Sequence, residues 1–397
     1  MQDRKSFKNL LDILLTSTKL GITSFGGPVA HLGYFKNEYV DRKKWLDDKT
    51  YADLIAICQF LPGPASSQVG MSIGMLRGGL IGGILSWIGF TLPSVIVLIL
   101  FAMLYNTFNL EGATFIHSLK VVAAAVVLHA LLGMGKNLAP DRPRITIALS
   151  AALIMLLFPS AWMQILIIVG AGLIGLKFFK ENAESKVQPF SVSISKRTGV
   201  ISLSLLGILL VGLPFLAKIT NHALLSIFDI FFRVGSLVFG GGHVVLPMLE
   251  REVVPQGWLT PDQFLAGYGM AQAVPGPLFT FSSYLGMMME GIGGAIVATI
   301  AIFLPSFFLI VGALPFLQEL RQRKPFQGIL MGVNASVVGI LLAAFYDPVL
   351  KSSIFDASDF ALGLVLFGLL NIWKVPAWMI VVLGVVGGYV LKVIGLI

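Results

Sequence analysis

Three stretches of the sequence, residues 80–104, 145–176 and 200–216, contain no charged residue at all. An apolar helix of about 20 residues is long enough to cross the hydrocarbon core of a bilayer. Charged residues make up only 12% of the chain, roughly half of what a soluble domain carries. We therefore predict an all-α polytopic membrane protein that is embedded in the lipid bilayer and has lipid as a partner.

The chain carries one ordered set of motifs twice, which indicates an internal duplication. The Gly- and Pro-rich members of this set are Phe25-Gly26-Gly27-Pro28 and Pro62-Gly63-Pro64, then Phe239-Gly240-Gly241-Gly242 and Pro275-Gly276-Pro277. Other matched positions are Lys19 with Arg233, Glu38 with Glu252, Gln59 with Gln272, and Leu92-Pro93-Ser94 with Leu304-Pro305-Ser306. We assign residues 1–180 to a first repeat, 181–223 to a linker with one crossing span, and 224–397 to a second repeat.

The basic residues of the loops change sides between the two repeats. The loop at 36–49 carries five Lys or Arg residues, whereas its counterpart at 250–262 carries only Arg251. The loop at 105–115 has none, whereas its counterpart contains Arg321, Arg323 and Lys324. Because cytoplasmic loops are enriched in Lys and Arg, we expect the repeats to lie upside down relative to one another, with the N-terminus in the cytoplasm. Many secondary transporters share this inverted plan.

Within this plan we expect four broken, re-entrant helical hairpins and about nine full spans. The hairpins are expected at residues 6–40, 50–77, 224–250 and 263–290. The spans are expected near 80–104, 116–136, 144–158, 160–177, 199–217, 291–316, 326–346, 359–373 and 376–396. In the alternative arrangement some hairpins cross the membrane fully, which changes the number of spans and the side of the C-terminus.

The Gly and Pro breaks predict a site at mid-membrane. Broken backbone at that depth is tolerated where it is buried in protein or lines a polar cavity. A half-helix that begins there presents free N–H groups and the positive end of its dipole, which suits a compact oxyanion. The predicted binding residues are Lys19, Ser24, Gly26, Gly27, Gln59, Gly63, Ser66, Ser67, Arg233, Gly240, Gly241, Gly242, Gln272, Gly276 and Thr280. The breaks themselves are assigned to Pro28, Pro62, Pro64, Pro275 and Pro277.

Several of these residues have a second interpretation. Asp229, four residues before Arg233, is placed to neutralise it, whereas Lys19 has only the more distant Asp12. The two glutamines could instead cap the broken backbone. His31 and His243 are candidates for proton coupling or ordinary packing residues. The matched Glu38 and Glu252 are interfacial or salt-bridged, with gating or proton coupling as the alternative.

Taken together, these motifs resemble the chromate ion transporter family in its two-domain long form. The resemblance rests on Phe25-Gly26-Gly27-Pro28 with His31, on Phe239-Gly240-Gly241-Gly242-His243, and on the two Pro-Gly-Pro turns. It implies a bacterial inner-membrane protein that moves chromate outward, driven by the membrane potential or a proton gradient. Sulfate, another tetrahedral dianion, is the expected competitor or substrate.

The sequence therefore predicts a secondary active transporter of an oxyanion, with an anion channel or uniporter as the alternative. Motifs of hydrolases, zinc enzymes and nucleotide-binding loops are absent, so we expect no enzyme, no metal site and no cofactor. The net charge of +8 lies in loops between apolar runs, so we expect no nucleic-acid partner. Besides the small inorganic oxyanion, a second copy of the chain, forming a homodimer, remains open as a partner.

Overall fold

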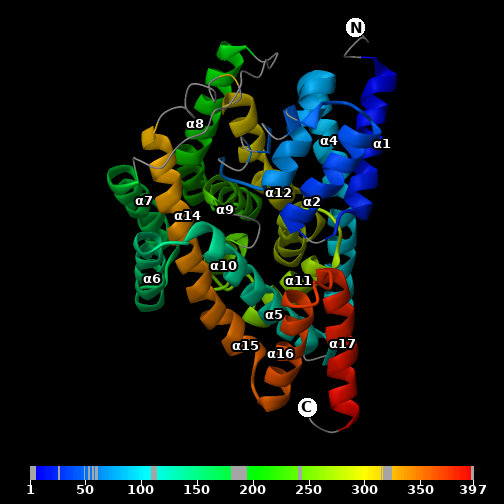
Figure 1. Ribbon diagram of the computed structural model, residues 1–397, viewed down its shortest axis with the longest axis vertical. Helices are drawn as coiled ribbons and strands as arrows, with labels where there is room; N and C mark the ends of the chain where they lie inside the picture. Colours follow the sequence, from blue (N-terminus) through cyan, green and yellow to red (C-terminus); the bar gives the residue numbers. More distant parts are fainter. Residues whose placement is uncertain are drawn as a thin grey trace.

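The computed structural model describes residues 6–25, 27–48, 50–51, 54–55, 58, 61–108, 114–179, 195–239, 244–313, 315 and 324–394 (Figure 1). This part of the chain is helical and contains no strand. The first repeat contributes α1 (Phe7–Thr23), α2 (Gly27–Phe35) continued by the π-helical η1 (Lys36–Arg42), α4 (Ala65–Thr107), α5 (Thr114–Leu138), α6 (Arg142–Leu157) and α7 (Ala161–Phe178). The connecting helix is α8 (Lys196–Thr220).

The second repeat begins with α9 (Ala223–Leu237), α10 (Val245–Val253) and α11 (Pro261–Ala273), followed by the short η3 (Leu278–Thr280) and α12 (Phe281–Ala313). It ends with α14 (Lys324–Ala344), η4 (Phe345–Leu350), α15 (Lys351–Ser353), α16 (Ala357–Asn371) and α17 (Ala377–Val393). The order of elements confirms an all-α chain with helices broken at the Gly and Pro motifs.

The helices α4 and α12 each reverse direction at a glycine. In α4, Gly78 and Gly79 leave the helical conformation, and Gly79 has φ +65°. The Ser86 hydroxyl donates to the Gly70 carbonyl at 2.8 Å, which requires the two arms to run antiparallel. The break at Glu290 and Gly291 has the same effect in α12. The break at Gly78 and Gly79 confirms the hairpin end predicted at residue 77. The arm at residues 65–77 is about 20 Å long, which is too short to cross a bilayer core.

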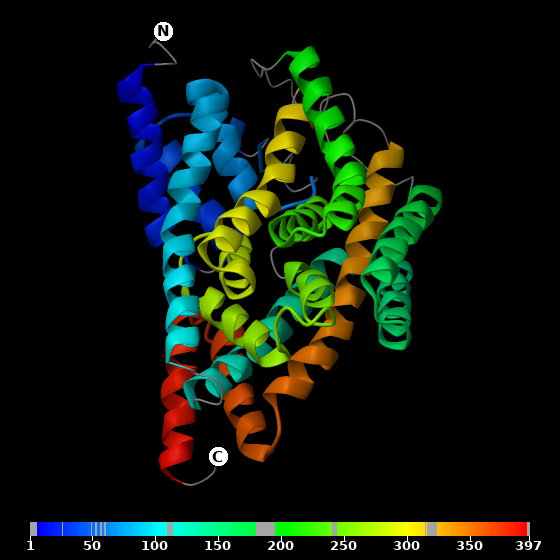
Figure 2. The same cartoon turned by 180° about the vertical axis from the view of Figure 1, so that it is seen from behind.

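The two repeats have opposite orientations. Helix α5 rises from the lower end of the molecule, whereas its counterpart α14 descends from the upper end (Figure 2). The start of α1 and the end of α17 lie at opposite ends of the long axis. Close packing is repeated too, since Gly21 of α1 faces the Phe90 carbonyl of α4 and Gly235 of α9 faces the Ile302 carbonyl of α12.

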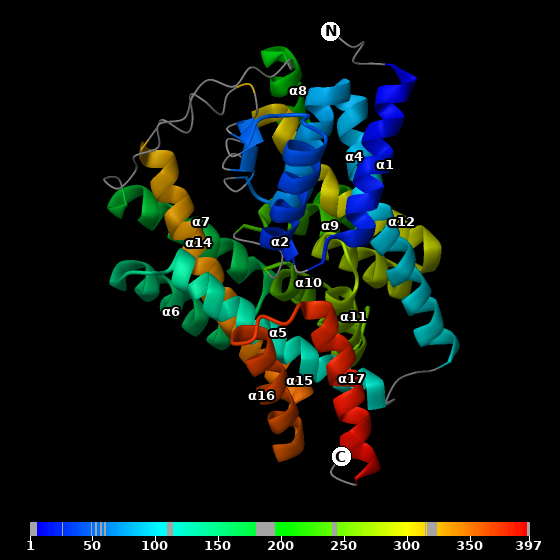
Figure 3. The ribbon, with the colours of Figure 1, turned by 45° about the vertical axis from the view of Figure 1, so that its right-hand side comes forward.

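The repeats are interlocked in space. Helix α14 of the second repeat packs against α6 and α7 of the first. Helix α5 of the first repeat packs against α16 and α17 of the second (Figure 3). Each repeat therefore completes its neighbour's helix packing.

Five described helices are long and apolar enough to cross a membrane, namely 65–107, 114–138, 196–220, 278–312 and 327–353. Shorter apolar helices cover 162–178, 357–371 and 377–393. Many large apolar side chains on these helices are exposed, for example Ile208 at 66% and Leu166 at 63%. Such surfaces are stable against lipid. The chain is a multi-pass membrane protein, and the number of nine full spans stays a prediction.

Candidate functional site

Two backbone hydrogen bonds join the breaks of opposite repeats. The Gly63 amide of the first Pro-Gly-Pro turn donates to the Val238 carbonyl at 2.6 Å, at the end of α9. The Gly276 amide of the second turn donates to the Ser24 carbonyl at 2.9 Å, at the end of α1. Because Gly63 matches Gly276 and Ser24 matches Val238 in the repeats, the two bonds are equivalent.

Side chains connect these two pairs. The His31 Nδ1 atom of α2 lies 3.2 Å from the Ser66 hydroxyl, in the first turn of α4. The ring of His31 also packs edge-on against Phe90, whose carbonyl lies beside Gly276. The described residues next to the breaks, Ser24, Gly63, Val238 and Gly276, are therefore connected in one continuous cluster.

Helices begin at these breaks without side-chain caps. Pro64 precedes α4, Val244 precedes α10 and Pro277 precedes η3, and none of their side chains accepts a capping hydrogen bond. First-turn N–H groups have no partner inside a helix. Helix N-termini of this kind favour anions.

Buried polar atoms without hydrogen-bond partners concentrate around the breaks. Among the described residues they include Ser24 Oγ, His31 Nε2, Ser67 Oγ, Gln68 Oε1, Thr91 Oγ1, Gln272 Nε2 and Ser282 Oγ. Ser24, Gln68 and Ser282 are 0% exposed. Because buried polar groups are normally hydrogen-bonded, such a cluster indicates a place where a polar ligand supplies the missing partners.

The two central glycines are required by both conformation and space. Gly63 has φ +112° and Gly276 has φ +96°, values that favour glycine. A Cβ atom on Gly63 would collide with the Ser306 hydroxyl, and one on Gly276 would lie 2.9 Å from the Ser94 hydroxyl. Each turn therefore fits against the Leu-Pro-Ser triplet of the other repeat.

Sequence reasoning missed Ser94, Ser306 and Gln68 as members of this cluster. The duplicated Leu-Pro-Ser triplet was a signal that could have found the two serines. Gln68 donates through Nε2 to the Pro62 carbonyl at 2.6 Å and to Ser306 at 3.3 Å. Its matched position is Phe281, so the repeat carries no signal for it.

The matched cations are paired with the matched glutamates. Lys19 Nζ lies 2.5 Å from Glu38, which also binds Arg42 at 3.1 Å. Arg233 donates to both Glu252 oxygens, at 2.7 and 3.1 Å, and to Asp229 at 3.1 Å. The salt-bridged interpretation of both glutamates is therefore the one observed.

Lys19 and Arg233 occupy matched positions but differ in exposure, and Lys19 does not pair with Asp12. The Lys19 side chain is 47% exposed, whereas that of Arg233 is 18% exposed. Asp12, expected as the distant partner of Lys19, instead pairs with Lys43 at 2.6 Å. In both repeats the cation joins the two arms of its own hairpin.

Other predicted residues take local roles or fall outside the described chain. The Thr280 hydroxyl donates to the Pro277 carbonyl at 2.7 Å, and Gly27 has φ +80°. Gly26, Gln59, Gly240, Gly241, Gly242 and His243 lie outside the described residues, as does the side chain of Pro28. No group of three or more potential metal ligands occurs among the residues that were placed.

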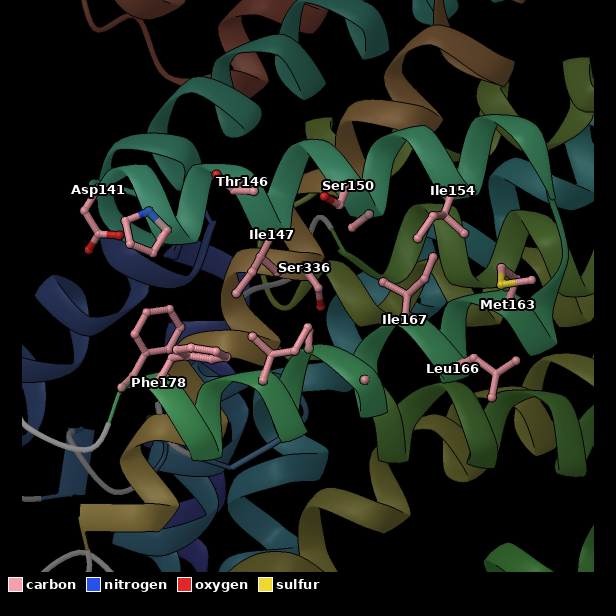
Figure 4. A pocket seen from close by; sticks show the side chains of 16 residues that line it. Asp141, Thr146, Ile147, Ser150, Ile154, Met163, Leu166, Ile167, Phe178 and Ser336 are labelled. Carbon is pink, nitrogen blue, oxygen red and sulfur yellow. The ribbon is translucent and has the colours of Figure 1, made fainter.

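A cavity of about 840 Å³ lies elsewhere, between α6, α7 and α14. Figure 4 shows that its lining is mostly apolar, with Ile147, Ile154 and Leu166 among the side chains that face it. The described lining includes the hydroxyl groups of Thr146, Ser150 and Ser336 but no Lys, Arg or His, and its charged member, Asp141, is a carboxylate that disfavours an oxyanion. The cluster at the breaks is therefore the better candidate for an anion site.

Residues 11–176 and 225–389 match the sequence profile of the chromate transporter family. The chain belongs to this family. It is 28% identical to the chromate transport protein of Pseudomonas aeruginosa over 83% of this chain and 78% of that protein. It is 26% identical to the probable chromate transport protein of Synechococcus elongatus over 97% and 95% of the two chains.

One relative corresponds to a single repeat. The uncharacterized transporter YwrA of Bacillus subtilis is 28% identical over 42% of this chain and 96% of its own length. No solved structure matches this member of the chromate transporter family.

Proposed function

We propose that this protein is a secondary active transporter of a tetrahedral oxyanion, chromate foremost, with sulfate as competitor or second substrate. The observation that carries the proposal is the cluster of buried, unpartnered polar atoms around the described parts of the helix breaks, in a chain of the chromate transporter family. Hydroxyl and amide donors with helix N-termini suit four oxygens that carry two negative charges.

The ion pairs place limits on how the anion is held. Arg233 lies between Asp229 and Glu252, and Lys19 binds Glu38, so neither cation brings a free positive charge to the cluster. Backbone N–H groups and hydroxyls then provide most of the binding. Lys19 and Arg233 balance the substrate charge only when they shift away from their carboxylates.

The transport direction and the location follow as parts of this proposal. Chromate moves outward across a bacterial inner membrane, with the N-terminus in the cytoplasm. The cluster lies between helices of inverted repeats, which is the arrangement expected for alternating access. An anion uniporter is the competing possibility.

Uptake into proteoliposomes tests the proposal. Radiolabelled chromate uptake, measured with and without an imposed pH gradient, should be reduced by unlabelled chromate, sulfate and molybdate. Ser67→Ala should weaken uptake about tenfold, because a buried hydroxyl that binds a charged ligand contributes roughly 1.5–3 kcal/mol. The exposed Ser195→Ala serves as the control. Wild-type vesicles that take up none of the three anions would contradict the proposal.

A further inference from the structure

Three charged residues follow one another on α10, and only one of the carboxylates is satisfied. Glu252 forms two hydrogen bonds with Arg233. Glu250 is only 5% exposed, and its Oε2 atom has no hydrogen-bond partner among the described residues. Its nearest cation is the neighbouring Arg251, whose Nε lies 3.4 Å from Oε2. Glu250 is a buried carboxylate with weak compensation.

The surroundings of Glu250 favour its neutral form. Burial raises the pKa of Glu250 to about 7, against the partial opposition of Arg251, and Asp347 of η4 adds a repelling charge. Glu250 also lies in the last turn of a helix, where the dipole disfavours an anion. Helix α10 has nine residues and is too short to cross a membrane, so Glu250 does not lie in a membrane-spanning helix.

The charged groups of the neighbouring elements are engaged elsewhere. Helix α9 contributes Arg233 and Asp229, which bind each other and Glu252. Asp347 pairs with Lys351 at 2.8 Å, and Asp262 of α11 pairs with Lys120 at 3.0 Å. Helix α7 faces α10 with the neutral Gln164, whose Nε2 donates to the Pro247 carbonyl at 3.0 Å.

The first repeat has no such carboxyl group. The position that matches Glu250 is Lys36, because both precede the matched glutamates by two residues. Lys36 is exposed and lies 3.0 Å from Asp48 and 3.5 Å from Asp41. A hydrogen bond to Asp48 raises the pKa of Lys36, so it stays charged at neutral pH. The fold of the module therefore does not itself require a buried acid at this position.

We propose that Glu250 is the proton-binding site that couples anion transport to the proton gradient. This inference rests on the proposed function. A protonated Glu250 is stable in its buried position on α10, which packs against α7 and α14, whereas a charged one favours water. Helix α10 is the second arm of the hairpin that carries the Gly240-Gly241-Gly242 break. Binding or losing one proton therefore shifts the equilibrium between two positions of this arm.

Proteoliposomes of the full chain test the coupling. Glu250→Gln, which mimics the protonated carboxyl, should keep chromate–chromate exchange within about twofold of wild type and lose its dependence on pH between about pH 6 and 8. Accumulation driven by an imposed pH gradient should fall at least about tenfold. Glu250→Asp, which still titrates, should keep coupled accumulation. Glu290→Gln, an exposed glutamate at the α12 turn, is the matched control and should leave both activities unchanged.

A second measurement reads proton binding without transport. A carboxyl whose pKa is raised on folding stabilises the protein less as pH rises from about 4.5 to 7. The melting temperature of Glu250→Gln relative to wild type should therefore increase over this range and stay level above it. A difference that does not change with pH overturns the inference.

The outcomes separate the two proposals. Wild-type vesicles that exchange chromate but ignore a pH gradient overturn the coupling and leave the proposed function standing. The same holds if Glu250→Gln accumulates chromate as well as wild type does, or if it loses exchange too. Vesicles without any oxyanion exchange contradict the proposed function, while the melting experiment still reports whether Glu250 binds a proton.

Discussion

At the scale of single residues, matched positions share partners but differ in environment. Lys19 and Arg233 bind matched glutamates, yet the Arg233 side chain lies between two buried carboxylates and is 18% exposed, whereas that of Lys19 is 47% exposed. The sequence predicted that the two positions correspond, and it offered the pairing of Asp229 with Arg233 as one of two interpretations. It did not predict the Lys19–Glu38 pair, because that contact joins two arms of a hairpin and depends on the angle between them.

This difference predicts unequal losses of stability. Arg233→Ala should destabilise the protein by about 3–5 kcal/mol, because it leaves two buried carboxylates without a cation. Lys19→Ala should cost less than about 1 kcal/mol, since the pair is partly exposed and Glu38 keeps Arg42. Thermal unfolding in detergent measures both. Equal losses would show that burial does not separate the two pairs.

The turn glycines carry a second residue-level prediction. Gly63→Ala places a Cβ against the Ser306 hydroxyl at a positive φ, so chromate uptake should fall more than about tenfold while some folded protein remains. Gly276→Ala should have a smaller effect, since its Cβ would lie 2.9 Å from Ser94. Gly33→Ala, in open space on α2, should behave like wild type. Uptake that is normal in Gly63→Ala would contradict this.

At the scale of elements, the two arms of α4, and likewise those of α12, pack closely because glycines lie where they touch. A Cβ on Gly74 would collide with the Gly82 carbonyl, and Gly286 and Gly294 stand in the same relation. The sequence predicted the ends of these arms at 77 and 290, with Arg77 marking the end of the first. It did not predict the π-helical turns η1 and η4, for which no residue pattern is diagnostic.

Enlarging Gly74 should therefore prevent the hairpin from closing. Gly74→Leu should yield little protein that elutes as a single species from size-exclusion chromatography, because the overlap involves backbone atoms that cannot rotate away. Gly207→Leu, on α8 with no atom near its Cβ position, is the control and should be recovered normally. Normal recovery of Gly74→Leu would mean that the arms separate without loss of the fold.

At the scale of the whole molecule, the repeats are joined by exchanged helices. The pairs α6–α7 and α16–α17 each pack on the central helix of the other repeat. The order of the motifs predicted the duplication, and the distribution of basic residues among the loops predicted its inversion. The packing of helices of one repeat on the central helix of the other could not be predicted, because no local feature of an apolar helix specifies which distant helix it contacts.

The exchange predicts that neither half is stable alone. Residues 1–187 and 188–397, expressed separately, should be degraded or aggregate, because α5 and α14 would expose apolar faces that the other half covers. Expressed together, they should co-purify and restore chromate uptake. Recovery of either half as a well-behaved membrane protein by itself would show that the exchanged contacts add little stability.

The reciprocal amide–carbonyl bonds between each Pro-Gly-Pro turn and the opposite break have a mechanical consequence. A displacement of one Pro-Gly-Pro turn acts directly on the backbone at the break of the other repeat, so we expect the two repeats to move together during transport. Such coupled movement would prevent the binding site from opening to both sides of the membrane at once, and so would limit the leak of other ions.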